Sequence, residues 1–200
     1  MTGPARVTGF DAIVVTGGRA GRMGGVDKAA LVVGGRTLGA SVAGAVIGAR
    51  RVIVVGPVPP EFPEGTIVTT EVPPGGGPVA AVAAGVAHVT AGEVVLLAVD
   101  LPFVTEHAVD ALRAARGGAA AAMAVDGDGR DQPLCSLWRT AALRAALAAL
   151  GEPAGVAMHR LVAAAGPITR LDGHAGAWFD CDTPADVAEA ASRATRAARR

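Results

Sequence analysis

The chain has 200 residues, and its 18 Lys and Arg residues balance its 18 Asp and Glu residues, so the formal net charge is zero. A protein without a net positive field is not expected to bind nucleic acid or a membrane surface, and we expect small-molecule substrates. Hydrophobic residues make up 51% of the chain and aromatic residues only 3%. This size predicts a single domain over residues 1–200, with a core of Val, Leu and Ala.

The two cysteines and the N-terminal residues indicate a cellular compartment. Cys135 and Cys181 are far apart in the sequence and lack metal-ligand spacing, which favours reduced, structural thiols. The first nine residues contain no apolar signal core, and no apolar run approaches the roughly 18 residues that span a bilayer. We therefore expect a cytoplasmic protein. The basic residues 193–200 are interpreted as a solvated helix end.

Short apolar runs alternate with amphipathic stretches along the chain, a pattern that predicts an α/β fold with helices covering a mostly parallel sheet. Strands are expected over residues 12–15, 51–55, 66–69, 94–99, 120–124 and 134–138. Helices are expected over residues 37–48, 79–88, 106–116, 140–150, 156–164 and 185–198. Gly and Pro clusters separate these elements and are too short to be linkers between domains.

The most informative segment follows the first predicted strand, where residues 14–28 read VVTGGRAGRMGGVDK. Glycines let backbone N–H groups approach an anion closely, and Arg19, Arg22 and Lys28 add three cations. Ligands of open α/β sheets bind at the carboxyl ends of the strands. The segment therefore predicts a phosphate-binding loop.

Two common nucleotide loops do not match this segment. A P-loop requires Ser or Thr after Gly-Lys, whereas Lys28 follows Asp27 and precedes Ala29. A dinucleotide fingerprint requires Gly-x-Gly-x-x-Gly and an acidic residue roughly 20 residues further on, at the end of the second strand. The second predicted strand ends instead in Gly56-Pro57. Both classes of site are therefore excluded.

The run Thr16-Gly17-Gly18, followed by Arg22-Met23-Gly24 and Asp27-Lys28, resembles the signature loop of the molybdenum cofactor guanylyltransferases, a nucleotidyltransferase family. That signature reads apolar-Ala-Gly-Gly, a spacer, Arg-Met-Gly and then Asp-Lys, so Thr16 replaces the usual Ala. The resemblance implies a three-layer Rossmann-like fold, with a mostly parallel central sheet and helices on both faces. It further implies a nucleotide-binding half over about residues 1–105 and a second-substrate half over about residues 106–200.

Two aspartates lie next to predicted elements, and each can be interpreted either as a helix cap or as a metal ligand. Asp100 comes directly after the strand over 94–99 and could cap the next helix, although Thr105 is a better placed cap. Asp182 precedes Thr183-Pro184 and could likewise cap the last helix. The resemblance instead implies that Asp100 and Asp182 bind Mg²⁺, a cation that prefers carboxylate and phosphate oxygens. Asp180 is a secondary candidate.

Other residues are candidates for substrate contacts. Glu71 follows the third strand, and a carboxylate can read the adjacent N1–H and N2 donors of guanine. Arg130 and the Gln132-Pro133 pair resemble the family's segment on the side that receives the pterin substrate, although an ordinary turn explains them nearly as well. His159 and Arg160 could also reach that substrate, but an exposed helical face is the simpler interpretation.

The resemblance implies an enzyme that uses Mg²⁺ to transfer GMP from GTP to the phosphate of the molybdenum-pterin cofactor, with release of pyrophosphate. Arg22, Lys28 and Asp100 would be catalytic. The nucleotide would be bound by Val15, Thr16, Gly17, Gly18, Lys28, Glu71 and Asp100, with the backbone N–H groups of Gly17 and Gly18 on the triphosphate. Transient contacts with cofactor-delivering or cofactor-accepting enzymes are expected, and no protein nucleophile is needed.

Two alternatives stay open at this point. A related nucleotidyltransferase could use CTP or another acceptor and make the cytidylyl cofactor, or act on cobinamide phosphate, phospholactate or a sugar phosphate. A non-catalytic nucleotide-binding regulatory module is the second alternative. The residues RMGGVDK favour the molybdenum enzyme, and the presence of Lys28, Asp100 and Asp182 together argues against a module without turnover.

Overall fold

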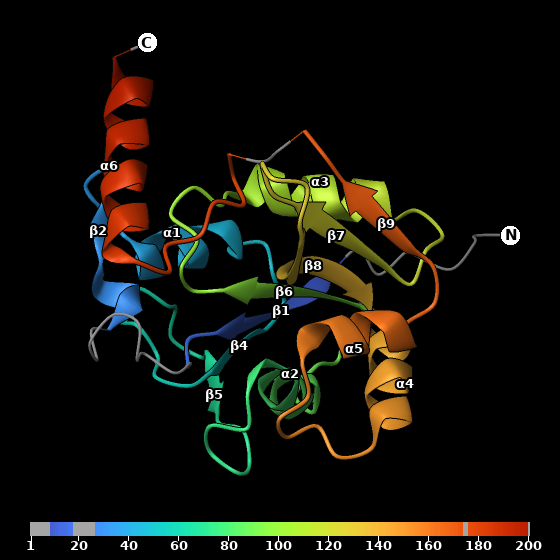
Figure 1. The fold of residues 1–200 in the computed structure, drawn as a ribbon. Helices are drawn as coiled ribbons and strands as arrows, with labels where there is room; N and C mark the ends of the chain where they lie inside the picture. The colour runs from blue at the N-terminus through green and yellow to red at the C-terminus, as the bar shows by residue number, and fades with distance from the viewer. Residues whose placement is uncertain (1–8, 18–26, 174–175, 200) are drawn as a thin grey trace, which may run out of the picture.

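The computed structural model describes residues 9–17, 27–173 and 176–199, and within them a seven-stranded sheet forms the centre of the molecule (Figure 1). Its strands are β1 (Phe10–Val15), β4 (Val52–Val55), β5 (Ile67–Thr69), β6 (Glu93–Ala98), β7 (Ala121–Val125), β8 (Asp131–Arg139) and β9 (Ile168–Leu171). The helices are α1 (Leu38–Ala45), α2 (Pro78–Val86), α3 (Glu106–Arg116), α4 (Thr140–Leu150), α5 (Met158–Ala164) and α6 (Pro184–Ala198). A short 3-10 helix, η2 (Lys28–Ala30), precedes a hairpin of β2 (Val32–Val33) and β3 (Arg36–Thr37).

The strand order is β5-β4-β1-β6-β8-β7-β9, and only β8 runs antiparallel to its neighbours. The expected α/β architecture with a mostly parallel sheet is therefore confirmed. All six predicted strands form within a few residues of the expected bounds. The strand β9 and the β2–β3 hairpin were not predicted, because runs of two to four partly exposed residues carry little hydrophobic periodicity.

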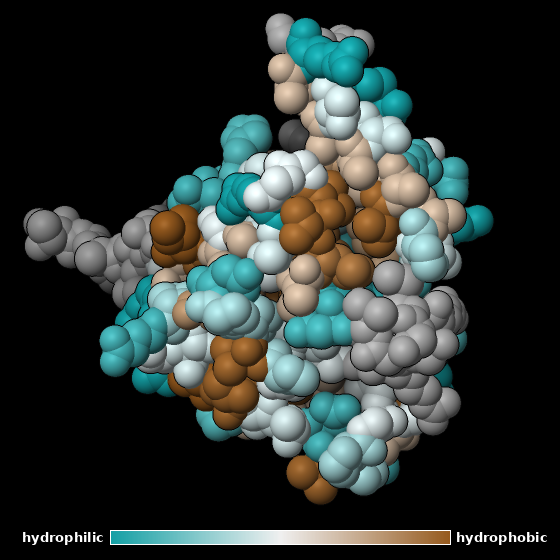
Figure 2. Space-filling model, turned by 90° about the vertical axis from the view of Figure 1, so that its left-hand side faces the viewer, coloured by the Kyte–Doolittle hydropathy of each residue, from teal (hydrophilic) through white to brown (hydrophobic). Residues whose placement is uncertain are grey.

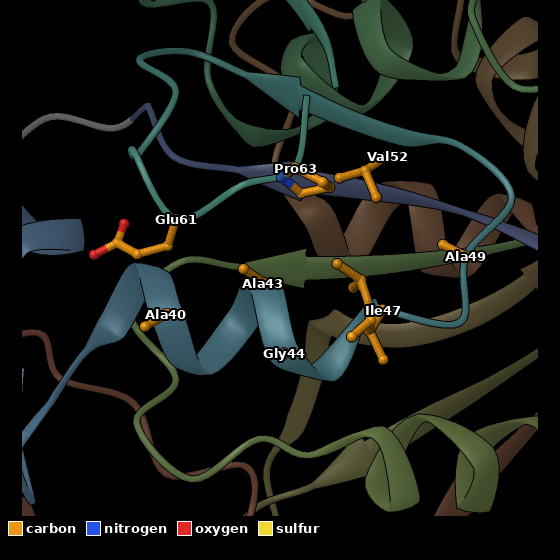
Figure 3. Close-up of a pocket in the computed structure, with 9 residues that line it drawn as sticks. Ala40, Ala43, Gly44, Ile47, Ala49, Val52, Glu61 and Pro63 are labelled. Carbon is orange, nitrogen blue, oxygen red and sulfur yellow. The ribbon is translucent and has the colours of Figure 1, made fainter. Parts of the chain in front are cut away.

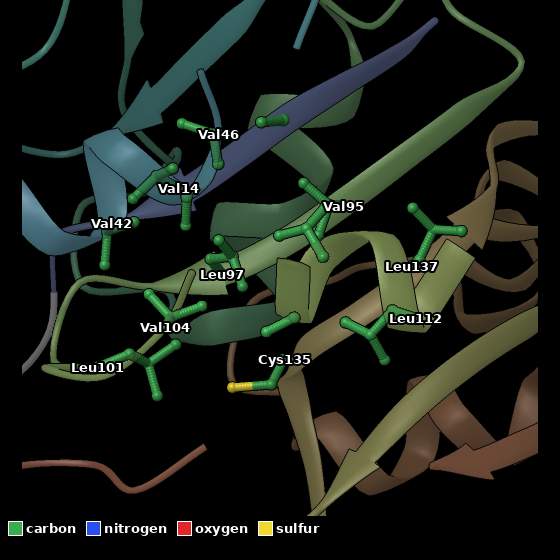
Figure 4. Packing of buried hydrophobic residues seen from close by; sticks show 14 of the residues in the cluster. Val14, Val42, Val46, Val95, Leu97, Leu101, Val104, Leu112, Cys135 and Leu137 are labelled. Carbon is green, nitrogen blue, oxygen red and sulfur yellow. The ribbon is translucent and has the colours of Figure 1, made fainter. Parts of the chain in front are cut away.

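Helices cover both faces of the sheet, α1 and α3 on one and α2, α4 and α5 on the other (Figure 1). Each layer encloses its own apolar cluster, and Figure 4 shows the one beneath α1 and α3. Close packing on the other face depends on Gly85 of α2, because a Cβ there would lie 2.8 Å from Cγ2 of Ile13 in β1. The central strands β1 and β6 are thereby buried on both sides, as parallel strands require.

Helix α6 stands at one edge of the molecule, against the β2–β3 hairpin (Figure 1). A capping box starts it: the Thr183 hydroxyl accepts from the backbone of Asp186, and the Asp186 carboxylate accepts from the backbone N–H of Thr183. Near its other end, the guanidinium of Arg193 lies 4.1 Å from the ring centroid of Phe179. These contacts hold the segment before α6 in place.

Two further expectations concern the cysteine thiols and membrane-spanning segments. Cys135 and Cys181 are both buried and form no disulfide. Within the described ranges, no helix combines the length and the apolar character that crossing a membrane would need.

Candidate active site

The site is built at the carboxyl ends of β1 and β6, two neighbouring parallel strands. The N–H of Val99 donates to the carbonyl oxygen of Val15, so the segments that follow the two strands leave the sheet side by side. Figure 2 looks at the molecule from the side toward which β6 points in Figure 1, with α6 at the top of this face. This is the sheet edge at which α/β proteins bind ligands.

One lysine joins two aspartates at this edge. The Lys28 ammonium donates to Oδ2 of Asp100 at 2.9 Å and to Oδ1 of Asp182 at 2.7 Å. Lys28 is presented by η2, whose first turn is capped by the Asp27 carboxylate. The lysine side chain is 21% exposed, and the two aspartates are 17% and 44% exposed, so all three are accessible to a ligand. The structure thus brings together three of the predicted site residues.

Local hydrogen bonds argue against the helix-cap interpretation of each aspartate. The hydroxyl of Thr105 caps α3, and the hydroxyl of Thr183 caps α6. Asp100 and Asp182 are therefore not helix caps, and their carboxylates accept from Lys28. A hydrogen bond from the N–H of Cys181 to the carbonyl oxygen of Asp100 joins the two segments.

Among the described residues, the site carries more carboxylates than cations. Burial alone would lower the pKa of the Lys28 ammonium, but the hydrogen bonds and charges of Asp182 and Asp100 outweigh it and raise that pKa. Burial, together with the charges of Asp100 and Asp182, raises the pKa of the nearby Asp180 carboxyl. Burial is also the main cause that raises the pKa of the Cys181 thiol to about 12, which keeps it protonated. One ammonium therefore faces more carboxylates than it can neutralise.

Lys28 is the only lysine of the chain, and the other seventeen basic residues among the 18 are arginines. An ammonium is a compact charge whose three donors can contact several oxygens, whereas a guanidinium binds one carboxylate through a planar fork. A lysine at this single position therefore suits contact with two carboxylates and, in a complex, with phosphate oxygens.

The residues present fit a magnesium ion. Asp100 and Asp182 each place a carboxylate oxygen within hydrogen-bond distance of the same nitrogen, so both oxygens lie near one point in space. Mg²⁺ in nucleotide sites is commonly held by one or two carboxylates and by substrate phosphates. No cluster of three or more His, Cys, Asp or Glu side chains arranged for a metal occurs among the described residues, so a bound ion would need ligands from the substrate.

Thr16, the departure from the expected signature, ties the nucleotide loop to the end of β4. Its hydroxyl lies 2.6 Å from the carbonyl oxygen of Pro57 and 3.3 Å from that of Val55. The backbone N–H groups of Thr16 and Gly17 also donate to Val55. The Gly17 N–H is therefore engaged within the fold, and its expected contact with the triphosphate stays a prediction.

Gly56 is required by this close approach of the two loops. Its φ is +114°, and an added Cβ would lie 2.6 Å from the nitrogen of Gly17 and 2.8 Å from Oγ1 of Thr16. A side chain at this position would displace backbone, which is costly. Gly56 and Pro57 thus leave room for Thr16 and accept its hydrogen bond, which explains the Gly-Pro end of β4.

We expect Thr16→Val to destabilise the protein by about 0.5–1.5 kcal/mol, the usual contribution of one hydrogen bond, and to weaken nucleotide binding. Valine keeps the shape of the side chain but cannot donate to Pro57. Urea unfolding and nucleotide titration of both proteins measure the two effects, with Thr195→Val on the exposed face of α6 as the matched control. Unchanged stability and unchanged nucleotide affinity would show that the tether has no function.

The remaining predicted residues are placed as follows. Gly18 and Arg22 lie outside the described residues. Glu71 lies on the loop after β5, where one carboxylate oxygen accepts from the N–H of Gly75 at 3.0 Å. Arg130 lies in the exposed turn between β7 and β8, beside Asp128 at 3.6 Å. His159 and Arg160 are exposed on α5.

A cleft of about 250 Å³ opens beside the aspartates. Its lining comprises Pro78, Ala98, Asp100, Leu101, Gln132, Pro133, Leu134, Cys135, Met158, Asp180 and Asp182. Of these, Met158 was not a candidate from the sequence, since a lone methionine carries no signal of binding. A larger hollow of about 430 Å³ lies along α1 and is lined mainly by Ala, Val and Ile residues (Figure 3). Glu61 is the one charged residue of that lining, so the hollow lacks the groups for phosphate chemistry.

The fold and this charged edge define a nucleotide-binding α/β protein, and comparison with known proteins identifies its class. Residues 12–171 match the family model of the MobA-like NTP transferase domain. A probable molybdenum cofactor guanylyltransferase of Deinococcus radiodurans is 30% identical over 184 residues, covering 91% of this chain and 94% of that protein. The chain belongs to the MobA-like NTP transferase family, and it is a nucleotidyltransferase.

Solved structures agree with this assignment. The 2-C-methyl-D-erythritol 4-phosphate cytidylyltransferase of Thermus thermophilus superimposes with a TM-score of 0.65 at 27% identity, covering 92% of this chain and 98% of that one. The molybdopterin-guanine dinucleotide biosynthesis protein A of Archaeoglobus fulgidus gives a TM-score of 0.68 at 18% identity, covering 94% and 100%. The second likeness shows that the three-layer Rossmann-like fold is shared.

Proposed function

We propose that this protein transfers GMP from GTP to the phosphate of the molybdenum-pterin cofactor and releases pyrophosphate. The observation that carries the proposal is the contact of Lys28 with Asp100 and Asp182 at the carboxyl edge of the sheet. The resemblance of the loop to the guanylyltransferase signature and the 30% identity to the Deinococcus protein support guanine and the molybdenum cofactor as substrates.

In the proposed reaction, a phosphate oxygen of the acceptor forms a bond to the α-phosphorus of GTP. The bond from that phosphorus to the oxygen bridging the α- and β-phosphates breaks, and pyrophosphate leaves with the electron pair. No group of the protein becomes covalently attached. Catalysis then rests on positioning and on stabilising charge in the transition state.

Each site residue has a role in this proposal. Lys28 donates hydrogen bonds to phosphate oxygens, and its flexible stem lets the ammonium move from the carboxylates to the nucleotide. Asp100 and Asp182 would hold Mg²⁺, which neutralises charge on the α-phosphate. The same carboxylates would repel a phosphate without a cation, so the excess negative charge of the site favours binding of the metal together with the nucleotide.

We assign the nucleotide to the half formed by about residues 1–105 and the acceptor to about residues 106–200. The loop after β1 lies in the first half, whereas the cleft beside the aspartates is lined largely from the second. Arg22 and Gly18 are proposed as further contacts of the triphosphate. Glu71 is proposed to read guanine, with its second carboxylate oxygen left for the base by the bond to Gly75.

A second candidate function is transfer of CMP from CTP. The 27% identity to the Thermus cytidylyltransferase across nearly the whole chain favours it. Guanylyl transfer is preferred because the loop carries the run Arg22-Met23-Gly24 before Asp27-Lys28.

The test measures pyrophosphate release with Mg²⁺ and the molybdenum-loaded pterin in the presence of GTP, CTP, ATP or UTP. Turnover with GTP alone is the expected result. Turnover with CTP alone would replace the proposal by the cytidylyl relative. No turnover with any nucleotide would overturn it.

A further inference from the structure

Part of the wall of the cleft is formed by an irregular part of β8. Met123 of β7 pairs with Ser136, and the next residue, Ala124, pairs with Gln132. The three residues between them, 133–135, form a bulge on this side of β8, and Gln132 and all three line the cleft. Bulges often redirect side chains beside active sites, and a proline is tolerated at one because it has no N–H to leave unpaired.

Buried hydrogen bonds hold this bulge in one conformation. The hydroxyl of Ser136 donates to the carbonyl oxygen of Pro133 at 2.6 Å, and Nε1 of Trp138 donates to the Ser136 oxygen at 2.8 Å. Ser136 and Trp138 are both fully buried. The backbone that carries Gln132 is therefore rigid, a requirement for a group that selects a ligand.

The Gln132 side chain is oriented by Asp126, the residue that begins the turn between β7 and β8. One oxygen of Asp126 accepts from the backbone N–H groups of Asp128 and Arg130 at 2.9 Å each, and the other accepts from Nε2 of Gln132 at 2.8 Å. Slight burial would raise the pKa of Asp126, but the hydrogen bonds from Arg130, Gln132 and Asp128 outweigh it and lower that pKa. Asp126 is ionised at neutral pH.

An ionised carboxylate only accepts hydrogen bonds, so the amide of Gln132 must turn its NH₂ group toward Asp126. The carbonyl oxygen Oε1 is then the polar atom of Gln132 that remains for a ligand, and none of the described residues donates to it. The other polar side chains of the lining, Asp100, Asp180 and Asp182, surround the proposed site of phosphoryl transfer. Gln132 is thus the polar side chain of the lining that lies outside this group of aspartates.

We infer that Gln132 selects the acceptor substrate by accepting a hydrogen bond from one of its N–H or O–H groups, and that Asp126 is the positioning residue that turns the Gln132 oxygen toward the acceptor. This inference rests on the proposed function, because it assigns the cleft to the acceptor. It specifies an acceptor that carries a hydrogen-bond donor as well as its phosphate.

The test compares Gln132→Ala, Asp126→Asn and the double variant in the pyrophosphate assay with GTP, Mg²⁺ and the molybdenum-loaded pterin. Asparagine retains the shape of Asp126, but its single oxygen is required by the backbone N–H groups of Asp128 and Arg130. Its NH₂ group then faces Gln132 and draws the Gln132 oxygen toward itself, away from the ligand. Each single variant is expected to raise the KM for the acceptor roughly 10-fold, with kcat and the KM for GTP unchanged. The double variant is expected to be no worse than Gln132→Ala alone.

Asp131→Asn is the matched control, since Asp131 lies in the same strand, pairs with Arg170 at 2.6 Å and does not line the cleft. It should leave the acceptor KM unchanged. A further rise of the acceptor KM when Asp126→Asn is added to Gln132→Ala would show that Asp126 only supports the turn, and would overturn its positioning role. An unchanged acceptor KM in Gln132→Ala would overturn the inference as a whole. Wild-type protein without turnover would instead overturn the proposed function, and the inference with it.

Discussion

Replacement of Lys28 by alanine is expected to slow pyrophosphate release by roughly 30- to 1,000-fold, the equivalent of losing about 2–4 kcal/mol of transition-state stabilisation. The ammonium is the one cation that the described structure places between Asp100 and Asp182. No other lysine exists in the chain to replace it. Steady-state kinetics with saturating GTP and acceptor measure the loss.

Two companion variants separate charge from shape at this position. Lys28→Met removes the charge but keeps most of the stem, and it should lose as much activity as alanine. Lys28→Arg keeps the charge but offers a planar fork, so we expect partial activity. Melting temperatures of all three proteins check folding, because loss of the ammonium leaves Asp100 and Asp182 facing each other without a cation.

The unique lysine also permits a chemical version of this experiment. An amine-reactive reagent can modify only the Lys28 side chain and the terminal α-amino group. GTP with Mg²⁺ should protect Lys28, whereas labelling of the α-amino group should be unchanged and serves as the internal control. Undiminished labelling of Lys28, or full activity of Lys28→Ala, would rule out its contact with the nucleotide.

Replacement of Asp100 by alanine is expected to abolish magnesium-dependent turnover, with a loss of more than about 100-fold. Asp100 follows the central strand β6 and is the least exposed member of the group around Lys28. The more exposed Asp182 should contribute less, so Asp182→Ala is expected mainly to raise the Mg²⁺ concentration needed for half-maximal rate. Titration of the rate with MgCl₂ measures both effects.

Asp110→Ala is the control for these variants. Asp110 is exposed on α3, in a pair with Arg113 at 3.4 Å, and its removal should change neither stability nor magnesium dependence appreciably. Normal activity of Asp100→Ala together with an unchanged magnesium titration would show that the metal is bound elsewhere. Equal losses in Asp100→Ala and Asp110→Ala would point to a general effect on folding instead.

Most of the fold follows from local patterns in the sequence. The apolar runs of β1, β4 and β6 are buried on both faces and therefore read clearly as parallel strands. The amphipathic repeat over residues 106–116 likewise predicted the same bounds that α3 has in the structure. The short strand β9 was missed because its four residues, ITRL, are neither continuously apolar nor alternating in burial.

The site divides in the same way between local and long-range information. The glycine-rich loop and its Asp-Lys ending carry their pattern in adjacent residues, so the sequence by itself predicted a phosphate-binding loop there. It also supplied Asp100 and Asp182 as carboxylates beside a strand and a helix, but each also allowed interpretation as a helix cap. That ambiguity is inherent, since a cap and a metal ligand use the same residue at the same place along the chain.

Only the tertiary structure showed which residues cap the two helices. Thr105 and Thr183 cap the two helices, and Lys28 reaches Asp100 and Asp182 across 72 and 154 residues of sequence. The orientation of Gln132 likewise depends on its contact with Asp126 across a turn. Sequence patterns report the residue types that a strand, helix or loop requires, because those requirements repeat within a few residues. Contacts between side chains brought together by folding have no such period, and they decide which of the available groups lie close enough to act together.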